Sequence, residues 1–189
     1  MSEQVSAFWP VQIGVFEYLF FVANWNDYSS TISSSLDSNL EKFGIGLGLK
    51  GKVIESYSHA KGDTFKEITQ KDHWPYNVKE RFEKEQFPFM LVIDESFEKF
   101  DPGKHRWGII WFSDFVNDPN SVPKIFGSLV RKIRQDIDLF EYLISLARDH
   151  KTKEFTEYFE IKPGIFGISV DIKALLFDIG GYLRDRIGG

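Results

Sequence analysis

The sequence predicts an α+β fold, in which a mainly antiparallel mixed sheet is packed by two to four helices. Runs of β-branched and aromatic residues indicate strands over 11–23, 87–93 and 107–112. Apolar residues at helical spacing indicate an amphipathic helix over 122–134. Strands and helices do not alternate regularly along the chain, and this irregular order favours an α+β fold over a doubly wound parallel sheet.

The first half of the chain predicts one short helix among several strands. Residues 18–22 form an unbroken apolar run, so we expect that strand to be buried on both faces; a helix is the competing interpretation of this segment. Apolar residues at every fourth position predict a helix over 30–43. Residues 43–49 alternate strictly between apolar residues and glycine, which predicts a strand with a bare glycine face. We expect two further strands, over 52–59 and 64–71, with a turn over 60–63 between them.

The middle of the chain predicts a charged helix followed by two strong strands. Pro75 lies where a helix over 74–86 would begin, a position that favours proline. The strands over 87–93 and 107–112 follow it and are expected to pair as neighbours. Trp107 and Trp111 share one face of the second strand, so we expect them in the core.

The last third predicts helices around a hairpin. Asp138 and Glu141 have the spacing of a capping box at the start of a helix over 136–150. This helix is expected either to stand alone or to fuse with 122–134 into one long kinked helix. Residues 155–171 predict a β-hairpin, and 172–183 predict a C-terminal amphipathic helix.

Composition restricts the classes of function. The 189 residues are long enough for one domain, and no linker divides the chain, so we expect a single domain over 1–189. The formal net charge of −5 argues against broad nucleic-acid binding. The chain has no cysteine, and its apolar runs are shorter than the roughly 20 residues that span a bilayer. We therefore expect a soluble, cytoplasmic protein, for which peripheral contact with a membrane stays open.

The stretch GLGLKGKV, residues 46–53, resembles the phosphate-binding loop of P-loop NTPases. Asp94 and Glu95 follow a buried strand, as the acidic residue of that family does. However, Val53 replaces the hydroxyl residue that would hold magnesium, and no helical pattern follows the loop. We interpret the stretch as a glycine-faced strand, and we predict no cofactor.

A second catalytic arrangement is available at the ends of the two strong strands. If 87–93 and 107–112 pair, His105 could approach Asp94 or Glu95 and form an acid–base pair. With Lys52, these residues make up the alternative prediction, a nucleotide-binding protein or hydrolase. None of the four histidines has the spacing of a metal motif, so no metal site is predicted.

The leading prediction is a non-catalytic protein-interaction or regulatory module that binds a protein partner or itself. A glycine-faced strand can form an open sheet edge, and tryptophans in loops often anchor interfaces. A membrane-active or self-assembling protein is the third hypothesis. The expected contact residues of the leading prediction are Gly44, Gly46, Gly48, Trp25 and Trp74.

Overall fold

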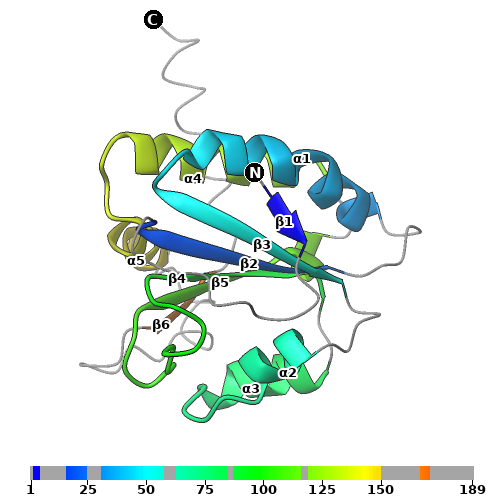
Figure 1. Ribbon diagram of the computed structural model, residues 1–189, viewed down its shortest axis with the longest axis vertical. Coiled ribbons are helices and arrows are strands. Elements are labelled where there is room, and N and C mark those ends of the chain that lie inside the picture. The colour runs from blue at the N-terminus through cyan, green and yellow to red at the C-terminus, as the bar shows by residue number, and fades with distance from the viewer. Residues whose placement is uncertain are drawn as a thin grey trace, which may run out of the picture.

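A mixed β-sheet forms the centre of the molecule, with helices on both of its faces (Figure 1). The computed structural model describes residues 2–4, 16–24, 31–57, 63–84, 87–115, 119–149 and 167–170. The strand order is β1-β3-β2-β4-β5-β6. The strands are β1 (Ser2–Gln4), β2 (Tyr18–Asn24), β3 (Gly51–Tyr57), β4 (Phe89–Ile93), β5 (Trp107–Trp111) and β6 (Gly167–Val170).

The four central strands, β3, β2, β4 and β5, are mostly antiparallel, as the sequence predicts. β4 runs antiparallel to both β2 and β5, whereas β3 runs parallel to β2. The outer strands β1 and β6 each pair in parallel with their neighbours. The fold class is therefore α+β.

β2 is buried along its whole length, which confirms the prediction made from its apolar run. Alternate residues enter two separate cores: Phe20 and Val22 face one side, and Leu19 and Phe21 face the other. A strand buried on both faces needs covering layers on both sides, and helices supply them.

The first layer consists of α1 (Thr31–Leu47), α4 (Ser121–Arg134) and α5 (Leu139–Asp149). In Figure 1, α1 and α4 lie side by side across the sheet. The rings of Phe43 on α1 and Phe126 on α4 stack with their centroids 4.3 Å apart. Ser35 Oγ near the start of α1 donates to the carbonyl oxygen of Pro119, just before α4. The two helices therefore run in the same direction.

The second layer consists of α2 (Asp63–Thr69), α3 (Tyr76–Glu83) and the connection between β4 and β5. In Figure 1, α2 and α3 lie on the side of the sheet opposite to α1. Aromatic side chains dominate this core, and Trp74 packs edge-on against Trp107 with ring centroids 4.9 Å apart. Trp107 and Trp111 are both buried there, which confirms the prediction that they share a core face.

Several predicted elements are confirmed. The charged helix appears as α3, and Pro75 is its N-cap residue. The strands over 87–93 and 107–112 pair as antiparallel neighbours. The helix over 122–134 appears as α4, and the N–H of Glu141 donates to Asp138 Oδ1 at 3.0 Å at the start of α5.

Two predictions about the elements are wrong. Residues 43–47 belong to α1 rather than to a strand, because Leu40, Phe43 and Leu47 continue its buried stripe at helical spacing. The predicted strand over 64–71 lies largely in α2, whose Ile68 is buried in the second core. Of the two alternatives for 136–150, the separate helix is the one observed: a turn in which Asp136 has a positive φ of 57° divides α5 from α4.

Other predictions fall wholly or partly outside the described residues. These are the strand segment 11–15, the turn over 60–62, the first hairpin strand over 155–162 and the C-terminal helix over 172–183. β6 lies within the predicted second hairpin strand, and it pairs with β5. Among the described helices, none combines the length and the apolar character needed to cross a bilayer.

The contact between α1 and α4 can be tested at Gly46. A Cβ atom at this position would lie 2.9 Å from Cγ2 of Val130, a stiff branched side chain. Gly46→Val should lower the free energy of unfolding by about 1–3 kcal/mol, because the helices would have to separate. Chemical denaturation measures this change, and adding Val130→Ala should recover part of it.

Gly127→Ala on α4 is the matched control. A Cβ atom there meets nothing within 4 Å. Because alanine is a better helix former than glycine, this variant should gain up to about 1 kcal/mol. Equal effects of the two glycine substitutions would contradict the close contact.

Candidate functional site at the C-terminal ends of α1 and α4

Large apolar side chains gather in solvent at one end of the molecule. Ile45 is 63% exposed, Leu49 is 77% exposed and Ile137 is 38% exposed. Among the described residues, Tyr76 is the one other large apolar side chain that is exposed to solvent. Ile45 lies in the last turn of α1, Leu49 lies in the turn that follows α1, and Ile137 lies in the turn after α4. We call Ile45, Leu49 and Ile137 the apolar end surface.

Polar contacts hold the two turns of the apolar end surface together. Arg134 Nε at the end of α4 donates to the carbonyl oxygen of Gly46 at 3.0 Å. Lys50 forms an ion pair with Asp136 across the two turns. Gly48 follows α1 with a φ of +61°, a left-handed conformation that glycine adopts readily at helix ends. The backbone beneath the apolar side chains is therefore fixed on both sides.

A polar cleft of about 200 Å³ lies beside this surface and shares Ile137 with it. Leu139 N–H, at the start of α5, donates to the hydroxyl oxygen of Tyr18 at 3.1 Å. Burial raises the pKa of Tyr18, and the hydrogen bond from Leu139 only partly offsets it. The cleft is lined by Glu17, Tyr18, Lys50, Ile133, Asp136, Ile137 and Asp138.

Charge pairs organise the cleft and its border. Hydrogen bonding to Asp136 raises the pKa of Lys50. Arg106 joins two acids: its Nε is 2.6 Å from Asp94 Oδ2 and its Nη1 is 2.9 Å from Asp138 Oδ2. Burial would raise the pKa of Asp138, but the N–H of Glu141 and the Arg106 guanidinium outweigh it and leave the pKa lowered. These paired groups serve mainly to position β4, β5 and α5.

The residues of the predicted acid–base pair are each engaged elsewhere. Asp94 is held by Arg106, as described above. Glu95 Oε1 accepts the N–H of Ser96 at 2.7 Å, which lowers the pKa of Glu95. His105 Nδ1 accepts the backbone N–H of Asp101 at 2.9 Å. The predicted strand pairing is correct, yet these side chains do not form a hydrogen-bonded dyad.

The stretch GLGLKGKV does not have the geometry of a phosphate-binding loop. It comprises the end of α1, a turn and the start of β3, so a helix precedes the turn and a strand follows it. A phosphate-binding loop has the opposite order, with the N-terminus of a helix after the glycines. Lys52 lies within β3 opposite Leu19 of β2, and Asp94 lies beyond the end of β4. The sheet thus separates the two groups by one strand.

The predicted interaction residues have different positions from those expected. Gly44 is buried in α1, and Gly46 allows the close approach of α4. Gly48 ends the helix rather than forming a sheet edge. Trp74 is 4% exposed, and its Nε1 donates to the carbonyl oxygen of Ile68, so it contributes to the core. Trp25 lies outside the described residues.

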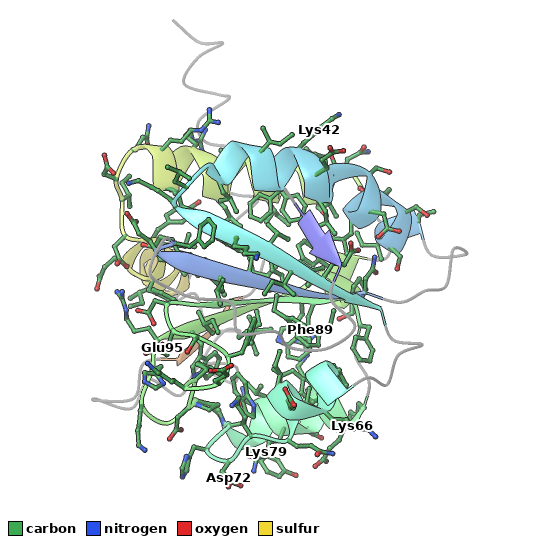
Figure 2. All side chains as sticks on the ribbon, in the orientation of Figure 1. Lys42, Lys66, Asp72, Lys79, Phe89 and Glu95 are labelled. Carbon is green, nitrogen blue, oxygen red and sulfur yellow. The ribbon has the colours of Figure 1, made fainter. Side chains whose placement is uncertain are left out.

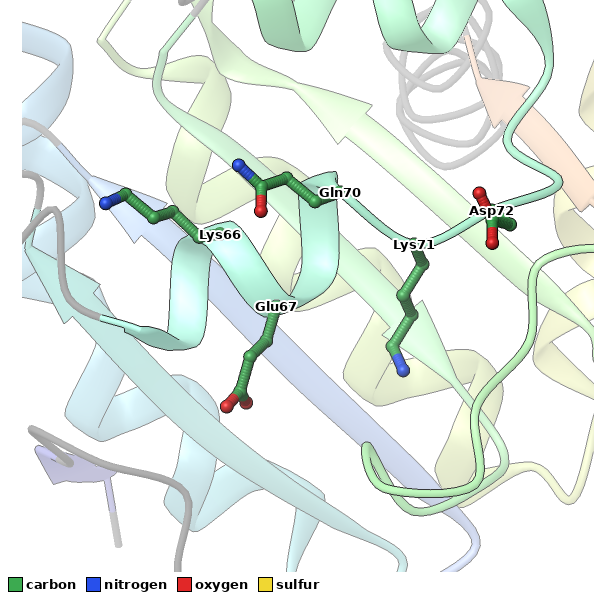
Figure 3. Close-up of a pocket in the computed structure, with 5 residues that line it drawn as sticks. All are labelled: Lys66, Glu67, Gln70, Lys71 and Asp72. Carbon is green, nitrogen blue, oxygen red and sulfur yellow. The ribbon is translucent and has the colours of Figure 1, made fainter.

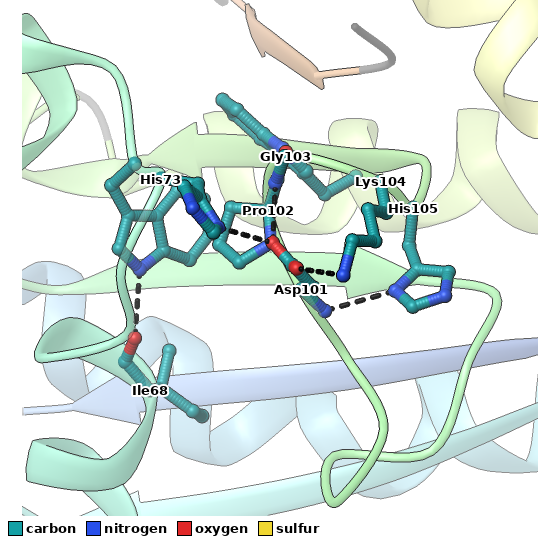
Figure 4. A network of polar contacts seen from close by, with 9 residues as sticks. Ile68, His73, Asp101, Pro102, Gly103, Lys104 and His105 are labelled. Carbon is teal, nitrogen blue, oxygen red and sulfur yellow. Dashed lines mark hydrogen bonds and ion pairs between the residues drawn. The ribbon is translucent and has the colours of Figure 1, made fainter.

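A polar network on the connection between β4 and β5 was not predicted (Figure 4). Asp101 Oδ1 accepts the N–H of Gly103 at 2.8 Å and lies 2.9 Å from His73 Nδ1. Lys104 Nζ lies 3.1 Å from Asp101 Oδ2. The N–H of Gly103 and the side chains of His73 and Lys104 hold the pKa of Asp101 well below its usual range. The network fastens this connection to the segment between α2 and α3.

Only part of this network has a signal in the sequence. The residues DPGKH, 101–105, predict the turn, and an aspartate two residues before a glycine often accepts its N–H. His73 lies 28 residues before Asp101 and has a positive φ of 70°, which no local pattern reveals. The His73–Asp101 contact is therefore a product of the tertiary fold.

An open depression of about 570 Å³ lies along α2 and the residues that follow it (Figure 3). Its side chains carry charges of both signs and are exposed or partly exposed, so they do not select one ligand charge. They are Lys66, Glu67, Gln70, Lys71 and Asp72. Figure 2 places Lys66 and Asp72 at the outer border of the second layer.

Comparisons with known proteins add no assignment. No family model, curated protein or solved structure matches the chain. Within the described ranges, no three histidine, aspartate or glutamate side chains come together in a way that could hold a metal ion. The apolar end surface is therefore the candidate site that the geometry supports best.

The ionised Asp101 gives a test of the network through pH. Because its folded pKa is lowered, the stability that it contributes is fully present above its unfolded pKa of about 4 and is lost as the pH falls below that value. Asp101→Asn should therefore be less stable than the wild type at neutral pH, and the difference should shrink below pH of about 4. Urea unfolding across this range measures it.

Asp72→Asn controls for the loss of one exposed negative charge near the network. If the difference in the free energy of unfolding between the wild type and Asp101→Asn stays constant down to the lowest pH, the carboxylate is not stabilised by these contacts.

Proposed function

We propose that this protein is a non-catalytic interaction module that docks onto a partner protein through the apolar end surface. The observation that carries the proposal is that Ile45, Leu49 and Ile137 are exposed at one end of the molecule. Scattered apolar side chains on a surface are ordinary, but clustered ones at a fixed site are typical of an interface. Isoleucine and leucine held on two anchored turns can insert into a partner with little loss of conformational freedom.

Charges around the surface favour a partner with an acidic border. Lys42 and Arg134 are exposed beside the apolar side chains, and Figure 2 shows Lys42 projecting outward from α1. Glu41 and Asp136 add negative charge, but Asp136 is paired with Lys50. Carboxylates on the partner would complement the exposed cations and orient the approach. Two copies meeting through this surface would each bring a net positive charge, since Lys42 and Arg134 outnumber Glu41 and Asp136 is paired, so a different protein fits better than a second copy.

The alternative hypotheses do not gain comparable support. The nucleotide or hydrolase proposal needs Lys52, Asp94, Glu95 and His105 to converge. Asp94 is held by Arg106 instead, and His105 accepts a backbone N–H. Contact with a membrane would also use exposed apolar side chains and cations, so it becomes an outcome of the experiment below.

A photo-crosslinking experiment can test the proposal. A benzoylphenylalanine at position 49 should crosslink one protein species in cells that express the chain, whereas the same group at position 76 should not. With that partner purified, Ile45→Ser combined with Leu49→Ser should weaken binding by at least about tenfold, since interface anchors contribute more than 1 kcal/mol each. Calorimetry measures the affinity.

Tyr76→Ser is the matched control, because Tyr76 is 82% exposed on α3, in the opposite layer. It should bind like the wild type, and all variants should keep the thermal midpoint of the wild type. Crosslinks only to lipid, only to a second copy, or equally from both positions would contradict the proposal.

A further inference from the structure

The C-terminal end of β2 carries a buried amide whose orientation is fixed. Asn24 is fully buried, and its Nδ2 donates to Asp37 Oδ1 at 2.7 Å and to the carbonyl oxygen of Ser33 at 3.4 Å. Both partners can only accept hydrogen bonds, so the nitrogen must face them. The oxygen Oδ1 then points to the other side of the amide.

Asn24 Oδ1 lacks a hydrogen-bond donor among the described residues. A buried carbonyl oxygen without a partner is unfavourable, because folding has removed it from water. Each such group in a folded protein calls for an explanation, and an unseen water or ion is a common one. The oxygen therefore marks a position where a donor or a positive charge is needed.

A second acid is buried on the neighbouring strand. Glu55 of β3 is 6% exposed. In the register it lies opposite Val22, and Val22 belongs to the core beneath α1. Because side chains alternate along a strand, Asn24 and Glu55 face the same side of the sheet, towards α1. Asp37 contacts the Nδ2 side of the same amide from α1, so Asn24 has one carboxyl group on the helix above it and another on the neighbouring strand.

The location is one where ligands bind in sheets that contain parallel strands. β2 and β3 run parallel, and the chain leaves β2 for α1 on one face of the sheet and leaves β3 for α2 on the other. Ligands of open α/β sheets bind beyond the carboxyl ends of the strands, where the connections diverge. Asn24 is the last residue of β2, and Glu55 lies near the end of β3.

We propose that this cluster is a binding site for a divalent cation, with Asn24 Oδ1 as a ligand and Asp37 and Glu55 as its charge partners. Hard cations such as Mg²⁺ and Ca²⁺ bind carboxylate and amide oxygens, and Mg²⁺ commonly uses one or two carboxylates and completes its shell with water. The start of α1 carries about half a positive charge, which opposes a cation. The carboxyl groups of Asp37, which contacts Asn24 from α1, and of the buried Glu55 would offset it.

Thermal unfolding with single metals tests the proposal. The protein, first treated with EDTA, is heated in MgCl₂, CaCl₂ or MnCl₂, with NaCl added to match the ionic strength. A ligand that binds only the folded state raises the midpoint as its concentration exceeds the dissociation constant. At least one metal should raise the midpoint in a saturable way, and calorimetry should give one ion per chain.

Asp37→Asn and Glu55→Gln remove one charge each at nearly constant shape and should weaken the binding at least tenfold. Asp72→Asn, an exposed acid outside the cluster, should bind like the wild type. If a variant fails to fold, broadening by Mn²⁺ of the backbone amide signals of residues 22–24 and 53–55 in the wild type still locates the ion.

Three outcomes would overturn the proposal. They are a response no larger than that to NaCl, a response unchanged in both charge variants, and Mn²⁺ broadening confined to other residues. Any of these would leave Asn24 Oδ1 as a hydrated buried group.

Discussion

The complete burial of β2 is the constraint on which the rest of the structure depends. Its side chains enter both cores, so neither layer of helices can be removed without exposing one of its faces. A fully apolar strand of this kind is stable only between two covering layers. The neighbouring strand is fitted equally closely: a Cβ atom at Gly51 would lie 2.9 Å from the ring of Phe20. The helices on each side therefore form and pack around this strand.

Because the middle of β2 is apolar, its polar chemistry is confined to its two ends. At one end, Tyr18 accepts the first N–H of α5 and lines the cleft beside the apolar end surface. At the other end, Asn24 meets the first turns of α1. The two proposed sites thus lie at opposite ends of the same strand. The rigid apolar segment between them separates a surface suited to docking from a buried cluster suited to a small ion.

Sequence reasoning succeeded where one periodicity stood without a competitor, as in β4, β5 and α4. It failed over 43–49, where two periodicities coincide. Phe43 and Leu47 are four residues apart and two strand repeats apart, so they fit a helix face and a strand face equally well. The packing of α1 on α4 decides the outcome and leaves Ile45 and Leu49 exposed. The contact between Asn24 and Asp37 had no sequence signal, because the two residues meet only through the crossover that leads from β2 to α1.

The stretch 43–49, which the sequence misassigns to a strand, supplies the apolar end surface with both glycines and large apolar residues. Gly46 lets α4 approach α1, and Gly48 turns the chain sharply after the helix. Both glycines thereby help to place Ile45, on the outer side of α1, and Leu49, in the turn after it, away from both cores. An exposed apolar side chain on a flexible loop could collapse onto the protein surface. On two turns joined by Arg134 and by the Lys50–Asp136 pair, it stays in solvent, and that geometry favours binding to a complementary surface.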